Sequence, residues 1–227
     1  MPLIQTSSSQ TNVIIESKNP SKVKDEFLGY HNNATNTHYG IRMSYPTDWR
    51  IEEQADSGSD DCDISIVSFF SPSFNPSGYN SEFSVALRLY DEETIPKNLK
   101  EELNFQKDIE SLTYAHFKTI ESDTHSTLAG YPAYKLVWTG EIDGIKEQIK
   151  EIGTIINGDV YYITYQAEPK TYSHYQSTVQ KMIDSFKIEK GGVSQTKYFL
   201  PYENSAYGIT KVTHIKCLGV TLPEQQP

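Results

Sequence analysis

Four aspartates lie close together in one glycine- and serine-rich stretch and have the side-chain chemistry of a cation site. Asp56, Asp60, Asp61 and Asp63 fall within a span of eight residues. Calcium takes several oxygen ligands from flexible loops, so this stretch is the best candidate for a metal site in the chain. The spacing is not that of an EF-hand, and no bidentate glutamate closes the loop. An acidic loop that is simply solvated is the competing interpretation.

No other group of residues has the spacing of a catalytic or metal site. The six histidines show no paired ligand spacing; they are His31, His38, His116, His125, His174 and His214. The sequence has no Gly-x-Ser-x-Gly elbow, no activated Cys–His pair and no glycine-rich phosphate loop. The acidic run Asp91-Glu92-Glu93 precedes an expected helix, where negative side chains favour the helix N-terminus and need no further role. We therefore expect a protein that is not an enzyme.

The composition of the chain limits its class. Its 227 residues are enough for one domain of ordinary size with polar tails. A net charge of −10, from 20 basic and 30 acidic residues, repels phosphate backbones, so nucleic-acid binding is not expected. Cys62 and Cys217 are too few for a disulfide framework or an all-cysteine zinc site. With no signal peptide at its start and no transmembrane run, the sequence leaves localisation open.

Hydrophobic periodicity predicts a mostly antiparallel sheet crossed by two helices. Residues 83–90 alternate between apolar and polar side chains, as a strand does. Asp143-Gly144 and Asn157-Gly158 are strong hairpin-turn signals. The second arm of the first hairpin, residues 145–156, does not alternate cleanly, and we expect a bulge in it. The expected strands are 39–45, 49–51, 64–70, 83–90, 117–121, 133–141, 145–156 and 160–167, and the expected helices begin at Pro96 and Pro169. This is the α+β class.

Two patterns predict where the core lies. Residues 160–167 are apolar or aromatic on both faces, which indicates a central strand covered on both sides. Leu99, Leu103, Gln106, Ile109 and Leu112 give the first helix one stripe directed at the sheet; they are spaced by three or four residues. Trp49, Trp138 and the tyrosines of residues 160–166 could instead line an aromatic ligand surface, but at strand spacing we expect them in the core.

The segment Tyr39-Gly-Ile-Arg-Met-Ser-Tyr-Pro-Thr-Asp-Trp49 resembles the start of PsbP-like domains. Val67-Ser-Phe-Phe-Ser-Pro72, Thr127-Leu-Ala-Gly-Tyr-Pro-Ala-Tyr134 and the closing block of residues 167–186 resemble the same family, and their order is right. The resemblance is nearest to the versions found in ammonia-oxidising archaea. It implies an α/β/α sandwich with a central, mostly antiparallel sheet. Plant members of the family are extrinsic, lumenal subunits of photosystem II that help to retain calcium and chloride, but no binding motif transfers such a residue to a position here.

The resemblance also sets the expected domain boundaries. Residues 1–37 are expected to be a flexible polar leader, with one short helix around residues 21–28, and residues 38–190 the PsbP-like domain. The pattern Asn-x-x-Tyr-Gly-Ile occurs at residues 36–41 and again at residues 204–209, 168 positions later. The second occurrence loses the family pattern at once. We therefore expect residues 191–227 to be a linker and the truncated start of a second repeat.

The leading functional hypothesis is a non-enzymatic binding or scaffold domain that docks a protein partner through its sheet edge or a sandwich face. It depends on the resemblance and on the missing catalytic set. The alternative is a calcium-binding accessory protein of an extracytoplasmic or photosystem II-like assembly, acting through residues 56–63. The family implies an extracytoplasmic location, although the chain carries no signal peptide.

Overall fold

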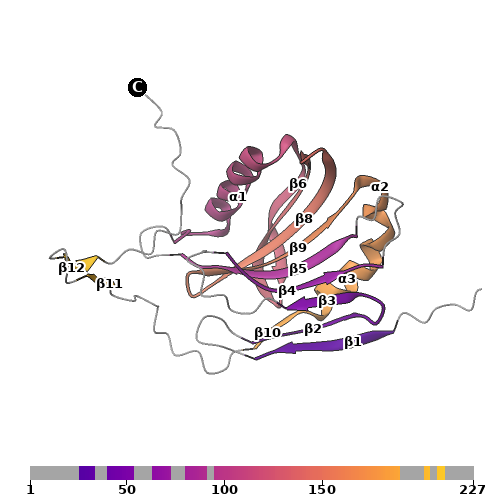
Figure 1. Cartoon of the computed structure of the whole chain (residues 1–227), viewed down its shortest axis with the longest axis horizontal. Helices are drawn as coiled ribbons and strands as arrows, with labels where there is room; N and C mark the ends of the chain where they lie inside the picture. Colours follow the sequence, from indigo (N-terminus) through magenta and orange to yellow (C-terminus); the bar gives the residue numbers. More distant parts are fainter. Residues whose placement is uncertain are drawn as a thin grey trace, which may run out of the picture.

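A seven-stranded antiparallel sheet forms the centre of the molecule (Figure 1). The computed structural model describes residues 26–33, 40–53, 63–72, 80–90 and 95–189, and the backbone of two short strands near the C-terminus. The strands of the large sheet are β3 (Arg50–Glu53), β4 (Asp63–Phe70), β5 (Glu82–Arg88), β6 (Ala115–Leu128), β7 (Tyr131–Ile142), β8 (Ile145–Ile156) and β9 (Asp159–Ala167). They lie in the order β3-β4-β5-β9-β8-β7-β6, so β9 is central as predicted.

The two predicted hairpin turns connect the long strands β7, β8 and β9. Asp143 and Gly144 have φ of 51° and 79°, and Asn157 and Gly158 have φ of 55° and 94°. Both central residues of a tight hairpin turn need positive φ, which Asn, Asp and Gly accept at low cost. The predicted bulge in β8 is wrong, because its register with both neighbours is unbroken. Apolar and polar side chains do not alternate cleanly in β8 because both faces of this strand are covered, not because a residue is inserted.

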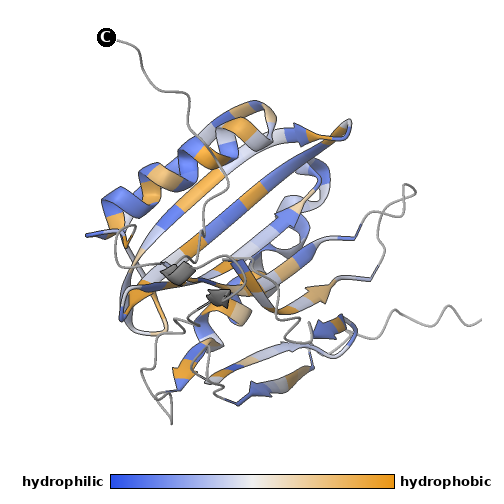
Figure 2. Cartoon of the chain, turned by 60° about the vertical axis from the view of Figure 1, so that its left-hand side comes forward, coloured by the Kyte–Doolittle hydropathy of each residue, from blue (hydrophilic) through white to orange (hydrophobic). Residues whose placement is uncertain are grey.

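Helix α1 (Leu99–Thr113) covers one face of the large sheet (Figure 1). It begins after Asn98, whose side-chain oxygen accepts hydrogen bonds from the backbone N–H groups of Lys100 and Glu101, at 3.0 Å each. The predicted apolar stripe is only partly correct. Leu103 is buried, but Leu112 is 67% exposed. Figure 2 shows both hydrophilic and hydrophobic residues along the helix, and the reason is that polar side chains carry much of its contact with the sheet.

The opposite face of the large sheet is covered by two short helices and a small sheet (Figure 1). The helices are α2 (Pro169–Tyr172) and α3 (Gln176–Ser185), and the small sheet consists of β1 (Phe27–Asn32), β2 (Gly40–Pro46) and β10 (Lys187–Glu189) in the order β1-β2-β10. The larger hydrophobic core lies here and includes Trp49, Phe69, Phe83, Met182 and Phe186. The predicted α+β fold with a central antiparallel sheet between two layers is therefore confirmed.

Strand β1 corrects the predicted N-terminal boundary. It lies inside the expected flexible leader and pairs with β2 over six residues, from Phe27 opposite Pro46 to Asn32 opposite Ile41. Tyr30 is buried and its ring meets the ring of Phe69 edge-on at 5.6 Å. The leader interpretation is wrong for residues 27–32. Phe27 and Leu28, at the end of the predicted short helix, belong to β1, and residues 21–25 lie outside the described residues. Residues 27–32 show little alternation of apolar and polar side chains, and they form a strand because they pair with β2.

The predicted truncated repeat lies almost entirely outside the described residues. Only the backbone of β11 (Tyr202–Asn204) and β12 (Ile209–Val212) is described there, and the two strands pair antiparallel. The repeat therefore stays a prediction. Within the part of the chain that the structure describes, none of the helices combines the length and the apolar character that a membrane span requires.

Candidate functional site

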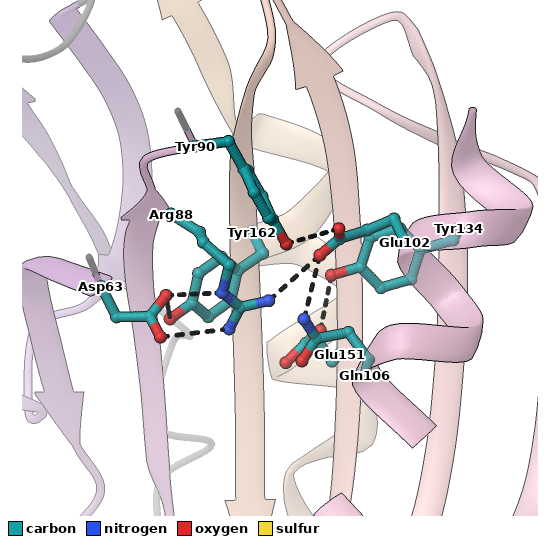
Figure 3. A network of polar contacts seen from close by, with 8 residues as sticks. All are labelled: Asp63, Arg88, Tyr90, Glu102, Gln106, Tyr134, Glu151 and Tyr162. Atoms are coloured by element: carbon teal, nitrogen blue, oxygen red, sulfur yellow. Dashed lines mark hydrogen bonds and ion pairs between the residues drawn. The ribbon is translucent and has the colours of Figure 1, made fainter. Parts of the chain in front are cut away.

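A network of polar side chains, in two hydrogen-bonded groups, lies between α1 and the sheet (Figure 3). Its members come from five strands or their ends and from the helix: Asp63, Arg88, Tyr90, Glu102, Gln106, Tyr134, Glu151 and Tyr162. The sheet residues share one face because side chains alternate along each strand. The apolar residues beside them on this face form the smaller of the two hydrophobic cores.

Arg88 is the charged centre of this network. Its Nε donates to Asp63 Oδ1 at 2.8 Å, and its Nη1 donates to Glu102 Oε1 at 3.1 Å. The hydroxyl of Tyr162 donates to Asp63 Oδ1 at 3.2 Å, and the guanidinium carbon lies 4.9 Å from the centre of the Tyr162 ring. Burial raises the pKa of Glu102, while the charge of Arg88 acts in the opposite direction. Arg88 thus joins a carboxylate on β4 to one on α1.

Tyrosine hydroxyls bind the carboxyl groups of Glu102 and of one further glutamate, Glu151 on β8, which lies next to the Arg88 group (Figure 3). Glu102 Oε2 accepts from the hydroxyl of Tyr90 at 2.7 Å, and Glu151 Oε1 accepts from the hydroxyl of Tyr134 at 2.5 Å. Burial raises the pKa of Glu151 to about 7. Burial, and then the nearby charge of Glu151, raise the pKa of Glu110 to about 8. The face of the sheet under α1 therefore holds carboxyl groups that resist ionisation.

The Tyr134–Glu151 contact requires a glycine on β8. Tyr134 pairs directly with Gly153, and its ring lies over that residue. A Cβ atom at Gly153 would come within 2.5 Å of the Tyr134 ring. A glycine inside a strand often marks such a close approach, so this residue was a signal in the sequence that the predictions did not use.

The inner part of the network is closed to substrates. The side chain of Glu102 is fully buried and Glu151 is 3% exposed, whereas the Asp63 side chain at the other end is 51% exposed. A general acid or base must reach the proton that it transfers, and these two glutamates lie under the helix. The arrangement fastens α1 to the sheet.

The predicted calcium ligands are not brought together within the described residues. Asp63, the first residue of β4, directs its carboxylate at Arg88 and Tyr162. Asp56, Asp60 and Asp61 lie outside the described residues. Among the residues that the structure describes, no three or more His, Cys, Asp or Glu side chains form a group that could hold a metal ion. Calcium binding by residues 56–63 therefore stays a prediction.

A second feature, a cavity of about 420 Å³, lies on the other face of the sheet between α3 and the strands β6, β7 and β8. The residues around it are mostly polar: Glu121, Ser126, Thr127, Ala129, Gly130, Lys135, Lys150, Ile152, Gln180, Ile183, Asp184, Phe186 and Lys187. Cavities of about 300–1,000 Å³ are the usual size for small-molecule sites. This cavity is one candidate binding site among the residues that the structure describes.

The two lysines on the sheet wall of this cavity differ in their partners. Lys135 Nζ lies 2.5 Å from Glu121 Oε1 and 3.1 Å from Asp123 Oδ2. Lys150 is half-buried and makes no side-chain hydrogen bond or ion pair with any described residue. Burial, and then the charge of Lys135, lower the pKa of Lys150. Neither lysine was singled out from the sequence, although each occupies an inward position on a predicted strand, where a charge is unusual.

The outer edge of the large sheet is the third feature. Strand β6 has 14 residues and pairs only with β7, so one side of its backbone carries no partner strand within the described structure. Its side chains are largely exposed, including Ile120 at 53%. The strand is longer than the predicted segment 117–121, because its continuation at both ends depends on pairing with β7.

These features define a three-layer α+β domain whose central antiparallel sheet has one helix on one face and two helices with a small sheet on the other. The chain belongs to the PsbP-like family: a family model described as PsbP-like protein matches residues 4–188. The match begins before residue 38, the predicted start of the domain.

Two bacterial proteins with solved structures are similar to this chain. The solution structure of cyanobacterial PsbP (CyanoP) from Synechocystis has a TM-score of 0.51 and 12% identity, with 77% of this chain and 99% of that chain covered. LpqN of Mycobacterium tuberculosis, described as involved in cell envelope biogenesis, has a TM-score of 0.48 and 13% identity, with 71% and 91% covered. A comparison with curated proteins gives no match.

Proposed function

We propose that this chain is a non-enzymatic binding domain that docks a protein partner, and that the partner adds an extended segment to the free edge of β6. The observation that carries the proposal is the geometry of this strand. It is 14 residues long, stands at the end of the strand order and exposes most of its side chains. An edge strand presents a row of unpaired N–H and C=O groups, which an extended peptide can bind.

The two edges of the large sheet differ in a way that supports this choice. The opposite edge strand, β3, has only four residues. Short edge strands are one way in which proteins limit unwanted pairing, so β3 offers little to a partner. Ile120 on β6 and Leu112 at the end of α1 are both more than half exposed and add apolar surface beside the β6 backbone.

Irregularities in β6 favour a different protein over a second copy of the chain. The register with β7 shifts at three places, between Ala115 and Lys118, between Thr119 and Glu121, and between Asp123 and Ser126. Bulges and charged side chains on an edge oppose direct pairing between identical sheets. The backbone of a partner strand must accommodate these register shifts. The shifts would therefore favour a partner segment that matches them over other extended segments.

The distribution of perturbed acids supports a role without catalysis. The carboxyl groups with raised pKa on the α1 face, Glu102 and Glu151, are covered by the helix. A catalytic role would require such groups to converge on an accessible pocket. The cavity between α3 and strands β6–β8 lies on the other face of the sheet.

A pair of matched variants tests the proposal. Ile120→Lys places a charge on the β6 edge, and Ile145→Lys makes the same change at another exposed isoleucine, 40% exposed at the start of β8. Proteins retained by the immobilised full chain from extracts of its source cells are quantified by mass spectrometry. The identified partner is then purified, and hydrogen exchange of the complex is measured.

The expected result is a partner that is retained equally by the wild type and Ile145→Lys and at least about tenfold less by Ile120→Lys. In the purified complex, the amides of β6 gain protection from exchange. The proposal fails if retention is indifferent to Ile120→Lys, or if protection appears elsewhere and leaves β6 unchanged.

A further inference from the structure

We propose that the cavity between α3 and strands β6–β8 binds a small oxyanion, a carboxylate or a phosphate group, and that Lys150 is its principal contact. The proposal is independent of a partner on β6. It starts from a lysine without a direct partner: Lys150 lines the cavity, is half-buried, and has no hydrogen bond or ion pair to any residue that the structure describes. The charge of Glu121 acts favourably on it, but the Glu121 carboxylate is bound to Lys135.

The register of the sheet places two ammonium groups on this wall. Lys150 of β8 pairs with Val137 of β7, and Lys135 of β7 pairs with Ile152 of β8. The two lysines are therefore diagonal neighbours on one face, with backbones separated by about 7–8 Å. Charges of like sign at this spacing repel, which matches the lowered pKa of Lys150.

The acidic groups around the cavity already have partners. Glu121 and Asp123 bind Lys135, at 2.5 and 3.1 Å. Asp184 Oδ1 accepts from Gln180 Nε2 at 2.8 Å. The carboxylates of the cavity wall thus have side-chain partners, although the partner of Asp184 is neutral and leaves its charge in place on the α3 side. Lys150 lines the same volume from the sheet side.

A desolvated ammonium group without a counter-charge is costly, and proteins usually pair such a charge. An oxyanion in the cavity would supply the missing charge at Lys150. Thr127 and Lys187 also line the volume and bring a hydroxyl and a further cation. The volume of about 420 Å³ exceeds what a single inorganic ion needs, so a small metabolite or a side chain bearing the oxyanion would fit.

The test uses two probes and a pair of lysine variants. Inorganic phosphate and succinate are titrated into the full chain at constant ionic strength, with sodium chloride as the reference, and amide shifts are followed by NMR. Lys150→Met removes the proposed contact. Lys146→Met makes the same change on the same strand at an exposed position outside the cavity.

We expect one or both probes to shift the amides of Thr127, Lys150 and Ile152, and Lys150→Met to weaken binding at least about tenfold. Lys146→Met should bind as the wild type does. Binding of phosphate alone identifies a phosphate-bearing ligand, and binding of succinate alone a carboxylate. Equal losses in both variants, or no shift beyond that caused by sodium chloride, would overturn the proposal.

A measurement on the wild type keeps the test independent of the variant's folding. The Lys150 ammonium group is titrated by NMR with and without saturating phosphate or succinate. Because a bound anion stabilises the charged form, the pKa of Lys150 should rise when the probe is present. An unchanged titration of Lys150 with both probes refutes the site.

Discussion

Replacement of Glu151 by Gln should make the domain more stable at alkaline pH. Glu151 lies almost fully buried beneath α1, and burial raises its pKa from an ordinary 4.5 to about 7. The folded state therefore binds the proton more tightly than the unfolded chain does. A carboxyl group of this kind contributes stability at pH values below 4.5, and the contribution is lost as the pH rises through about 7.

The size of the effect follows from the shift in pKa. A rise from 4.5 to about 7 corresponds to about 3 kcal/mol of unfolding free energy between acidic and alkaline pH. Gln at position 151 cannot ionise, so the variant lacks this loss. The hydrogen bond from the Tyr134 hydroxyl can still be accepted by the Gln side-chain oxygen. The raised pKa of Glu102 and Glu110 acts in the same direction. Burial raises both in either protein, whereas the part of the Glu110 rise that comes from the charge of Glu151 is lost in the variant.

Urea unfolding at pH 5, 6, 7 and 8, followed by tryptophan fluorescence, measures the difference. Trp138 lies in the same core and reports on it. Glu151→Gln should lie within about 1 kcal/mol of the wild type at pH 5, where a small part of the loss has already occurred, and exceed it by about 3 kcal/mol at pH 8. Glu141→Gln, at the end of β7, serves as the control and should follow the wild type. Parallel pH profiles for wild type and Glu151→Gln would refute the reasoning, even if the variant were uniformly less stable through a disturbed contact with Tyr134.

Two further predictions concern the close contact on β8 and the acidic loop. Gly153→Ala should destabilise the domain by about 1–3 kcal/mol, because a Cβ atom would lie within 2.5 Å of the Tyr134 ring. Gly29→Ala, where a Cβ atom meets nothing within 4 Å, should change the thermal midpoint little, and equal effects of the two would contradict this account. Calcium titrated calorimetrically into the full chain should bind weakly, near millimolar, if the loop of residues 56–63 is a site. Asp60→Asn with Asp61→Asn should abolish the heat, and no heat in the wild type would dismiss the site.

The sequence predicted the parts of the fold that depend on local chemistry. The turns at Asp143-Gly144 and Asn157-Gly158 need positive φ from two adjacent residues, which is a local requirement. The central position of β9 followed from its apolar side chains on both faces. Strand β1 was missed because its structure depends on pairing with β2, to which residues 27–32 contribute few apolar contacts.

The buried network was missed because no short stretch of sequence contains it. Arg88 and Glu102 are separated by 14 residues, and Tyr134 and Glu151 by 17. In the sequence alone, the charged residues among them are of types that are mostly found on the protein surface. The available signal was that Arg88 and Glu151 fall on predicted buried strands, where an unpaired charge would be costly. Lys135 and Lys150 are likewise charged residues on predicted buried strands. Such a position indicates that the charge needs a partner, but it does not identify the residue or ligand that provides it.

The two faces of the central sheet are held by different forces, and this difference bears on the β6 edge. On the α3 face, aromatic and aliphatic side chains form the larger core. On the other face, α1 buries only Glu102, Leu103 and Gln106. In a buried ion pair, the cost of desolvating the two charges offsets much of their attraction. The Arg88–Glu102 contact therefore fixes the position of α1 more than it adds to the stability of the domain. The helix also contacts β6, where Lys107 Nζ donates to Ser122 Oγ at 2.9 Å. The proposed docking strand, which pairs with β7, is thus joined to α1 by a polar contact as well.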